Sequence, residues 1–153
     1  MRFPAEIRSF FACGLPVGGK FFNWRDRSDA NLQNFHSFYE DMKDAFLFDL
    51  ENNGLQDLLG GKFTEITDTR LLVDAVWDYV QESPKLVPFY AHRCFFDGMD
   101  DMPIVSFWQP VDTIFYGGTF ENYLEVEFLK KECILERVVE RMENTGIWYE
   151  LIG

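Results

Sequence analysis

The sequence is poor in the residues that build most catalytic and metal sites. It has two histidines, His36 and His92, and three widely separated cysteines, Cys13, Cys94 and Cys133, with no CxxC pair. This spacing argues against a disulfide framework and against a zinc knuckle, and reduced thiols favour a cytoplasmic location. The GxSxG, HExxH and glycine-rich phosphate-binding motifs are all missing. The motifs therefore indicate no known type of active site, and we expect no metal site and no cofactor.

Long apolar runs and positive charge are also scarce. No window approaches 18 uninterrupted apolar residues, and the first eleven residues carry the acidic Glu6, so we expect no membrane span and no signal peptide. The chain has 14 Lys and Arg against 26 Asp and Glu, a formal net charge of −12. Such a charge repels nucleic acids and anionic membranes and attracts basic proteins, although it also serves solubility alone.

Aromatic residues are abundant, with 17 Phe and 4 Trp among 153 residues. A chain of this length forms about one domain and buries roughly 70% of its unfolded surface. We therefore expect one domain over residues 1–153 with a thick aromatic core. Some aromatic surface remains available for a partner, and both a monomer and a homodimer stay open.

Local patterns predict an α+β fold. Helices are expected over residues 4–12, 29–45, 68–82 and 119–129, with a further helical pattern over 134–142. Strands are expected over residues 46–50, 85–91, 104–108 and 112–117, the last two as a hairpin, with an acidic loop over 95–103. Pro88 places its strand at an edge or an end. This order predicts a mixed, mostly antiparallel sheet flanked by helices.

The segment FYAHRCFF, residues 89–96, places a base, a cation and a thiol side by side. On a strand, His92 and Cys94 share a face and can touch, which would suit a reactive pair. The alternative is a buried structural thiol between aromatic neighbours, the usual environment of cysteine, and we favour it. His36, Glu40 and Asp44 share a helical face, but one histidine with two carboxylates at this spacing is a weak metal pattern.

Two polar segments have both a structural and a docking interpretation. Residues 23–26, Asn-Trp-Arg-Asp, place an indole beside a potential ion pair of Arg25 and Asp26, and Trp and Arg are enriched in interfaces. Residues 49–53 are either an acidic docking strip or a turn that satisfies its own backbone. Both interpretations stay open for each segment.

Five segments together resemble the SUKH superfamily, in the branch similar to the yeast cell-wall-assembly regulator. They are FFNWRD (21–26), LFDLENNG (47–54), PKLVPFYAHR (84–93), PIVSFWQPVDTIFYG (103–117) and ENYLEVEF (121–128). The resemblance implies a compact α+β domain. It gives a structural role to the motif positions Asn23, Arg25, Asp26, Asn52, Asn53, Gly54, His92, Arg93, Gln109, Asp112, Tyr116 and Gly117.

The resemblance also implies a binding module and not an enzyme. Many bacterial members of the superfamily are immunity proteins that neutralise a toxin by direct binding, and others are scaffold or regulatory adaptors. For an immunity protein, we expect the toxin to contact Trp24, Asp49, Glu51, Asp97, Asp100 and Asp101. A third hypothesis, a small-ligand domain or enzyme, requires His92, Asp112 and Tyr116 to converge in an open pocket.

Overall fold

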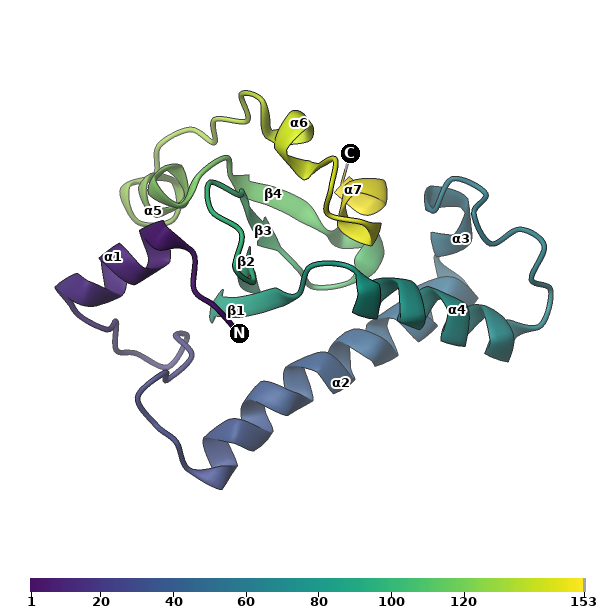
Figure 1. The fold of residues 1–153 in the computed structure, drawn as a ribbon, viewed down its shortest axis with the longest axis horizontal. Coiled ribbons are helices and arrows are strands. Elements are labelled where there is room, and N and C mark those ends of the chain that lie inside the picture. The colour runs from purple at the N-terminus through teal and green to yellow at the C-terminus, as the bar shows by residue number, and fades with distance from the viewer. Residues whose placement is uncertain (153) are drawn as a thin grey trace.

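The computed structural model describes residues 1–152, whose helices surround one antiparallel sheet (Figure 1). The strands β1 (Leu86–Tyr90), β2 (Arg93–Phe96), β3 (Ile104–Ser106) and β4 (Ile114–Gly117) lie in the order β1-β2-β3-β4. The helices are α1 (Ala5–Cys13), α2 (Asp29–Asn52), α3 (Leu55–Leu58), α4 (Thr69–Glu82), α5 (Phe120–Leu129), α6 (Val138–Met142) and α7 (Ile147–Ile152), and a short 3-10 helix spans Pro110–Asp112. The predicted α+β class is confirmed, and every strand pair is antiparallel.

The helices with clear N-terminal signals are where the sequence predicts them. The Asp68 side chain accepts hydrogen bonds from the backbone of Arg70 (2.9 Å) and Leu71 at the start of α4. Thr119 accepts one from the Asn122 backbone (3.1 Å) at the start of α5. Each cap satisfies a backbone N–H that has no partner inside the helix. These side chains therefore explain why α4 and α5 begin at the expected positions.

The helical pattern predicted over residues 134–142 forms a helix only from Val138. The Asn122 side chain accepts a hydrogen bond from the Ile134 backbone (2.9 Å) and donates one to the Glu132 carbonyl (3.0 Å). These bonds hold the backbone before α6 in a non-helical course. Arg137, the residue immediately before α6, has a φ of 55°, which lies in the left-handed region and outside the range of a helix.

The strand predicted over residues 46–50 is wrong, because α2 continues through it to Asn52. Met42, Phe46 and Asp49 are buried at spacings of four and three, which is the period of a helix, whereas Phe48 stays 48% exposed. The alternation of Phe46, Phe48 and Leu50 was therefore a misleading pattern. The helix ends where the chain turns at Gly54, whose φ of 67° suits glycine.

A strand that the sequence patterns missed, β2, begins inside the FYAHRCFF segment. β1 and β2 form an antiparallel hairpin in which Pro88 lies opposite Cys94, and a two-residue turn, Ala91 and His92, joins the strands. Ala91 adopts a φ of 51° without the glycine or asparagine typical of such turns, and its N–H donates to the Lys20 carbonyl (2.7 Å). The acidic loop therefore begins at residue 97 instead of 95.

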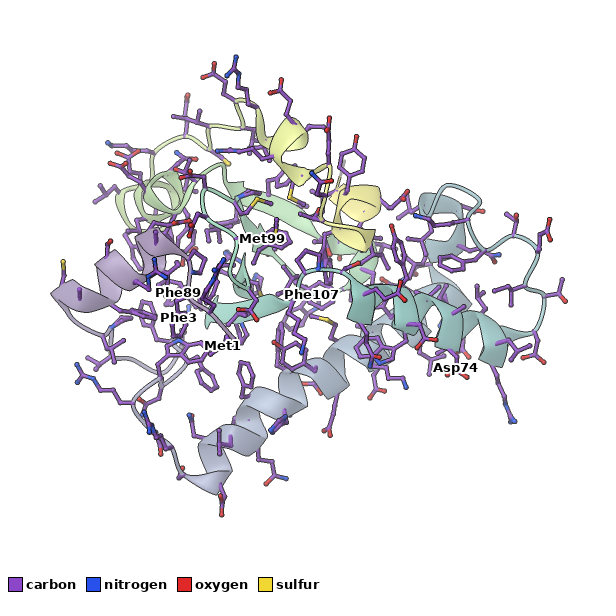
Figure 2. All side chains as sticks on the ribbon, in the orientation of Figure 1. Met1, Phe3, Asp74, Phe89, Met99 and Phe107 are labelled. Atoms are coloured by element: carbon purple, nitrogen blue, oxygen red, sulfur yellow. The ribbon has the colours of Figure 1, made fainter. Side chains whose placement is uncertain are left out.

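The sheet separates two aromatic cores. Alternate strand residues point to opposite faces, so Val87, Phe89, Phe95 and Ile104 pack with α1 and α5, whereas Leu86, Cys94, Phe96 and Val105 pack with α2, α4, α6 and α7. Figure 2 shows Phe89 near α1 and Phe107 toward α4. Burial of the apolar side chains on both faces stabilises the sheet against its helices.

The edge of the sheet at β1 is partly covered. Phe21 forms an isolated antiparallel bridge with Tyr90, and the Phe22 N–H donates to the Phe89 carbonyl (3.4 Å). Pro88 lies in this edge strand, as predicted. None of the helices in residues 1–152 combines the length and apolar character needed to cross a bilayer.

Candidate functional site

Arg93, on β2, connects its neighbours in the sheet to helix α5. Its Nε lies 3.3 Å from Glu127 Oε2 on α5, and its Nη1 donates to Ser106 Oγ on β3 (3.1 Å). Its guanidinium lies over the Tyr116 ring of β4, 3.5 Å from the centroid. The Arg93 and Glu127 side chains are only 12% and 16% exposed, so the pair is well shielded from water. Arg93 thus has a structural role in holding α5 against the sheet.

His92 and Cys94 do not form a reactive pair. Cys94 is fully buried, its Sγ faces the His92 carbonyl at 3.8 Å, and burial raises the pKa of its thiol. The His92 ring instead packs edge-on against Trp108, with centroids 5.7 Å apart. Partial burial and the neighbouring Arg93 charge lower the His92 pKa, which keeps the imidazole neutral at neutral pH.

The three residues required by the enzyme hypothesis lie in different environments. His92 contacts Trp108, Tyr116 contacts Arg93, and Asp112 is exposed on the 3-10 helix. Within residues 1–152, no hydrogen bond or ion pair links the side chains of the three. The structure therefore does not show the convergence that this hypothesis requires.

The acidic loop holds the N-terminal segment. Asp97 Oδ1 accepts a hydrogen bond from the Arg2 backbone (2.5 Å), and Asp100 Oδ1 accepts one from the Ala5 backbone at the start of α1 (2.7 Å). The Asp101 N–H donates to Glu6 Oε1 (3.2 Å). These bonds give Asp97 and Asp100, predicted as partner contacts, a structural function at the N-terminus of α1.

Residues 23–26 form a turn that precedes α2. Asn31 Nδ2 donates to the carbonyls of Asn23 (3.0 Å) and Asp26 (2.8 Å), and Asp26 Oδ1 accepts from the Ser28 backbone (2.8 Å), which lowers the Asp26 pKa. The half-buried Trp24 packs against Phe3, Phe22 and Phe35. The Arg25 side chain has no ion pair among the described residues, so the expected Arg25–Asp26 pair is not formed.

Asp49 is fully buried and lies away from the outer surface, contrary to the docking hypothesis. The strand predicted over residues 46–50 would have placed the Asp49 side chain at the surface, whereas the helix turns it inward. Its Oδ1 accepts a hydrogen bond from Asn53 Nδ2 (2.6 Å) and its Oδ2 accepts one from the Val111 backbone (3.0 Å). Asp49 therefore connects the end of α2 with the 3-10 helix, while Glu51 remains exposed.

Three other positions in the five segments, Asn52, Gln109 and Gly117, take part in local contacts. Asn52 Nδ2 donates to the Phe48 carbonyl (2.9 Å), and the Gln109 carbonyl accepts from Thr113 Oγ1 (3.0 Å). Gly117 lies so close to Tyr123 that an added Cβ would be 2.5 Å from the Tyr123 Cα. Gly117 is therefore required by the close approach of α5 to β4.

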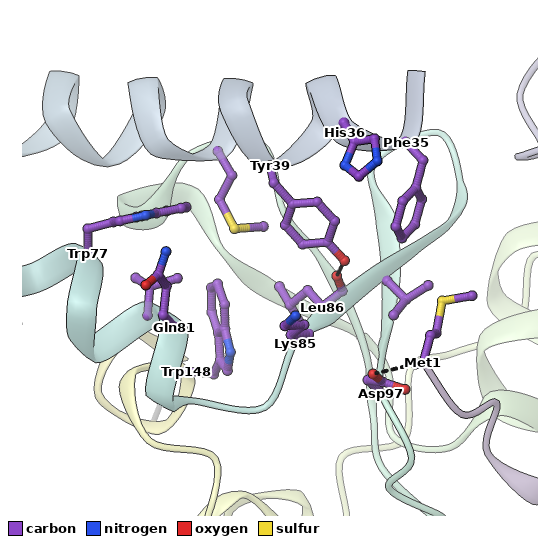
Figure 3. Close-up of a pocket in the computed structure, with 13 residues that line it drawn as sticks. Met1, Phe35, His36, Tyr39, Trp77, Gln81, Lys85, Leu86, Asp97 and Trp148 are labelled. Atoms are coloured by element: carbon purple, nitrogen blue, oxygen red, sulfur yellow. Dashed lines mark hydrogen bonds and ion pairs between the residues drawn. The ribbon is translucent and has the colours of Figure 1, made fainter. Parts of the chain in front are cut away.

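A cavity of about 580 Å³ lies between α2, α4 and β1 (Figure 3). Tyr39, Trp77 and Trp148 form aromatic walls, and the Tyr39 hydroxyl donates to the Leu86 carbonyl (3.0 Å). Burial raises the Tyr39 pKa, so this hydroxyl remains protonated. His36 lines the same cavity, but residues 1–152 contain no group of three histidine, cysteine or carboxylate side chains placed to hold a metal ion.

An acidic stripe that was not predicted from the sequence runs along the outer face of α2. Asp41, Asp44, Phe48 and Glu51, hereafter the α2 stripe, are all exposed and are separated by three, four and three residues. This spacing places them on one helical face, roughly opposite the buried Met42 and Phe46. None of the three carboxylates has an ion pair in the described part of the chain. Their charge is therefore available to a partner.

One end of the α2 stripe borders a second cavity, of about 460 Å³. This cavity, hereafter the Trp108 hollow, is lined by Phe38, Asp41, Met42, Ala91, His92, Phe107 and Trp108. Trp108 is 69% exposed, which is high for the largest side chain. The hollow and the stripe share Asp41 and together form one aromatic and acidic surface.

Comparisons with protein-family models, curated proteins and solved structures find no significant match to this chain. The SUKH resemblance therefore rests on the five sequence segments and stays a prediction.

Proposed function

We propose that the protein is a non-enzymatic binding module that captures a basic protein in the cytoplasm, as an immunity protein that neutralises a bacterial toxin. The α2 stripe is the observation that carries this proposal. Three unpaired carboxylates around the half-exposed Phe48 attract a basic surface over long range and offer it an apolar anchor.

The net charge of −12 and the SUKH resemblance support the same proposal. An acidic surface would bind the basic surface with which many toxins engage nucleic acids, and would block it. The partner face would thus consist of the α2 stripe and Trp108. Of the contacts expected from sequence, Glu51 belongs to this face.

The test is to co-express the chain with the toxin-like protein encoded beside it, and to measure binding by calorimetry and rescue of growth. The charge-reversal variant D41K/D44K/E51K should abolish rescue and weaken binding at least a hundredfold, since three attractive contacts become repulsive. The matched control E132K/E136K/E143K makes the same change in net charge at exposed carboxylates elsewhere. It should retain rescue.

Binding without rescue would instead identify an adaptor of the same superfamily. Absence of both binding and rescue with every toxin-like neighbour would refute the immunity proposal. Equal losses in both triple variants would show that net charge acts alone, without the α2 stripe.

A further inference from the structure

The walls of the Trp108 hollow are aromatic and have no cation from the chain itself. Phe38 and Phe107 meet at a centroid distance of 6.4 Å, and His92 meets Trp108 at 5.7 Å. Elsewhere in the described chain, lysine or arginine side chains lie over the rings of Trp77, Tyr79, Tyr90 and Tyr116. No such cation covers Phe38, Phe107 or Trp108 in residues 1–152.

Asp41 carries the only formal charge among the described residues that line the hollow, while the positive charges of Arg93 and Lys20 act on His92 from outside the lining. Asp41 is the sole carboxylate among the described lining residues, it has no ion pair there, and no lysine or arginine lines the cavity. The lowered pKa of His92 keeps its ring uncharged at neutral pH, so that it does not oppose a cation. An aromatic enclosure with one unpaired carboxylate is the environment that attracts an organic cation.

We infer that the Trp108 hollow binds the guanidinium of an arginine side chain on the partner protein. Arginine fits better than lysine, because its flat group stacks on an aromatic face and donates two parallel hydrogen bonds to a carboxylate. A volume of about 460 Å³ accommodates one such side chain and its aliphatic stem. The inference deepens the proposed function and rests on it, since it specifies how that partner is recognised.

The probe is a capped arginine, N-acetyl-arginine methylamide, titrated into the full ¹⁵N-labelled chain and followed by NMR. The expected result is a saturable shift of the Trp108 indole N–H and of the Ala91 and Phe107 amides. The uncharged isostere N-acetyl-citrulline methylamide should produce no saturable shift, and the lysine analogue should bind at least threefold more weakly, because it stacks less well.

Variants test the two halves of the hollow separately. Asp41→Asn should raise the Kd of the arginine probe about fivefold. Trp108→Leu should raise it at least threefold, measured from the shifts of the Ala91 and Phe107 amides because the indole is lost. Asp44→Asn is the matched control, because it removes the same charge on the α2 stripe outside the hollow. It should leave the Kd within about twofold.

Equal shifts with arginine and citrulline would overturn the inference, as would tighter binding of lysine or an unshifted Trp108 indole at probe saturation. An equal effect of Asp41→Asn and Asp44→Asn would show general electrostatic attraction and overturn it too. These readouts use no toxin. A failed arginine titration with intact stripe-dependent rescue would therefore refute the arginine pocket and leave the proposed function standing.

Discussion

Replacement of Asp49 by alanine should destabilise the fold and leave the partner surface in place. The carboxylate is fully buried, and it accepts from the Val111 backbone at 3.0 Å and from Asn53 Nδ2 at 2.6 Å. Loss of the acceptor leaves the half-buried Val111 N–H without a partner, at a cost of about 2 kcal/mol. The exposed Asn53 amide can turn to water, so its lost bond costs about 1 kcal/mol.

We therefore expect Asp49→Ala to lower the free energy of unfolding by about 3 kcal/mol. Urea denaturation followed by circular dichroism measures this change, and the m-value should stay constant because the same surface is exposed on unfolding. Asp44→Ala is the control on the exposed face of the same helix and should change stability by less than about 0.5 kcal/mol. A loss below about 1 kcal/mol for Asp49→Ala would contradict the reasoning.

Three further predictions concern the sheet and its neighbours. Arg93→Met should lower the free energy of unfolding by about 3 kcal/mol, because it leaves the Glu127 carboxylate shielded from water and unpaired. A double-mutant cycle with Glu127→Gln should show a coupling energy above about 1 kcal/mol, and zero coupling would disprove the pair. Gly118→Ala should lower the free energy of unfolding, measured by urea denaturation, by at least about 2 kcal/mol, because the added Cβ would lie 1.9 Å from the Ile134 carbonyl oxygen. The control Gly19→Ala places its Cβ near no other atom and should leave stability unchanged. Equal stabilities of the two variants would contradict the packing. The His92 pKa is lower in the folded state, so the unfolded state takes up the proton first, and stability should fall as the pH drops below the ordinary pKa of 6.5. Denaturation at a series of pH values should show a shallower loss of stability for His92→Gln than for the unchanged protein. Parallel curves for the two proteins would refute this linkage.

The parts of the fold that sequence reasoning located are those with strong local signals. The helix α4 has both an N-cap, Asp68, and an unambiguous apolar stripe. The strands β3 and β4 were predicted as a hairpin because a short connection that contains Pro110 joins two apolar runs. The strand β2 was missed because its turn uses Ala91, which carries no turn signal and is held by a bond to Lys20, 71 residues earlier in the chain. Such a tertiary contact is invisible in a local pattern.

The α2 stripe was not predicted from the sequence because the end of one helix was placed wrongly. Since the sequence analysis ended the helix at residue 45, Phe48 and Glu51 fell outside it, and their alignment with Asp41 and Asp44 was lost. The spacing of three, four and three was present in the sequence and would have revealed the stripe on a longer helix. The Trp108 hollow, in contrast, joins α2 to the β1–β2 turn and follows only from the tertiary fold.

The bond between Asp100 and the first turn of α1 has a consequence for the order of folding. Pro4 precedes α1 without a capping side chain, and the acceptor for the Ala5 N–H lies 95 residues further along the chain. During synthesis, α1 therefore leaves the ribosome long before its cap exists, and nine residues are too few for a stable helix in isolation. We expect α1 to dock after the rate-limiting step, so that Ile7→Ala speeds unfolding and leaves the refolding rate nearly unchanged, with a φ-value near zero.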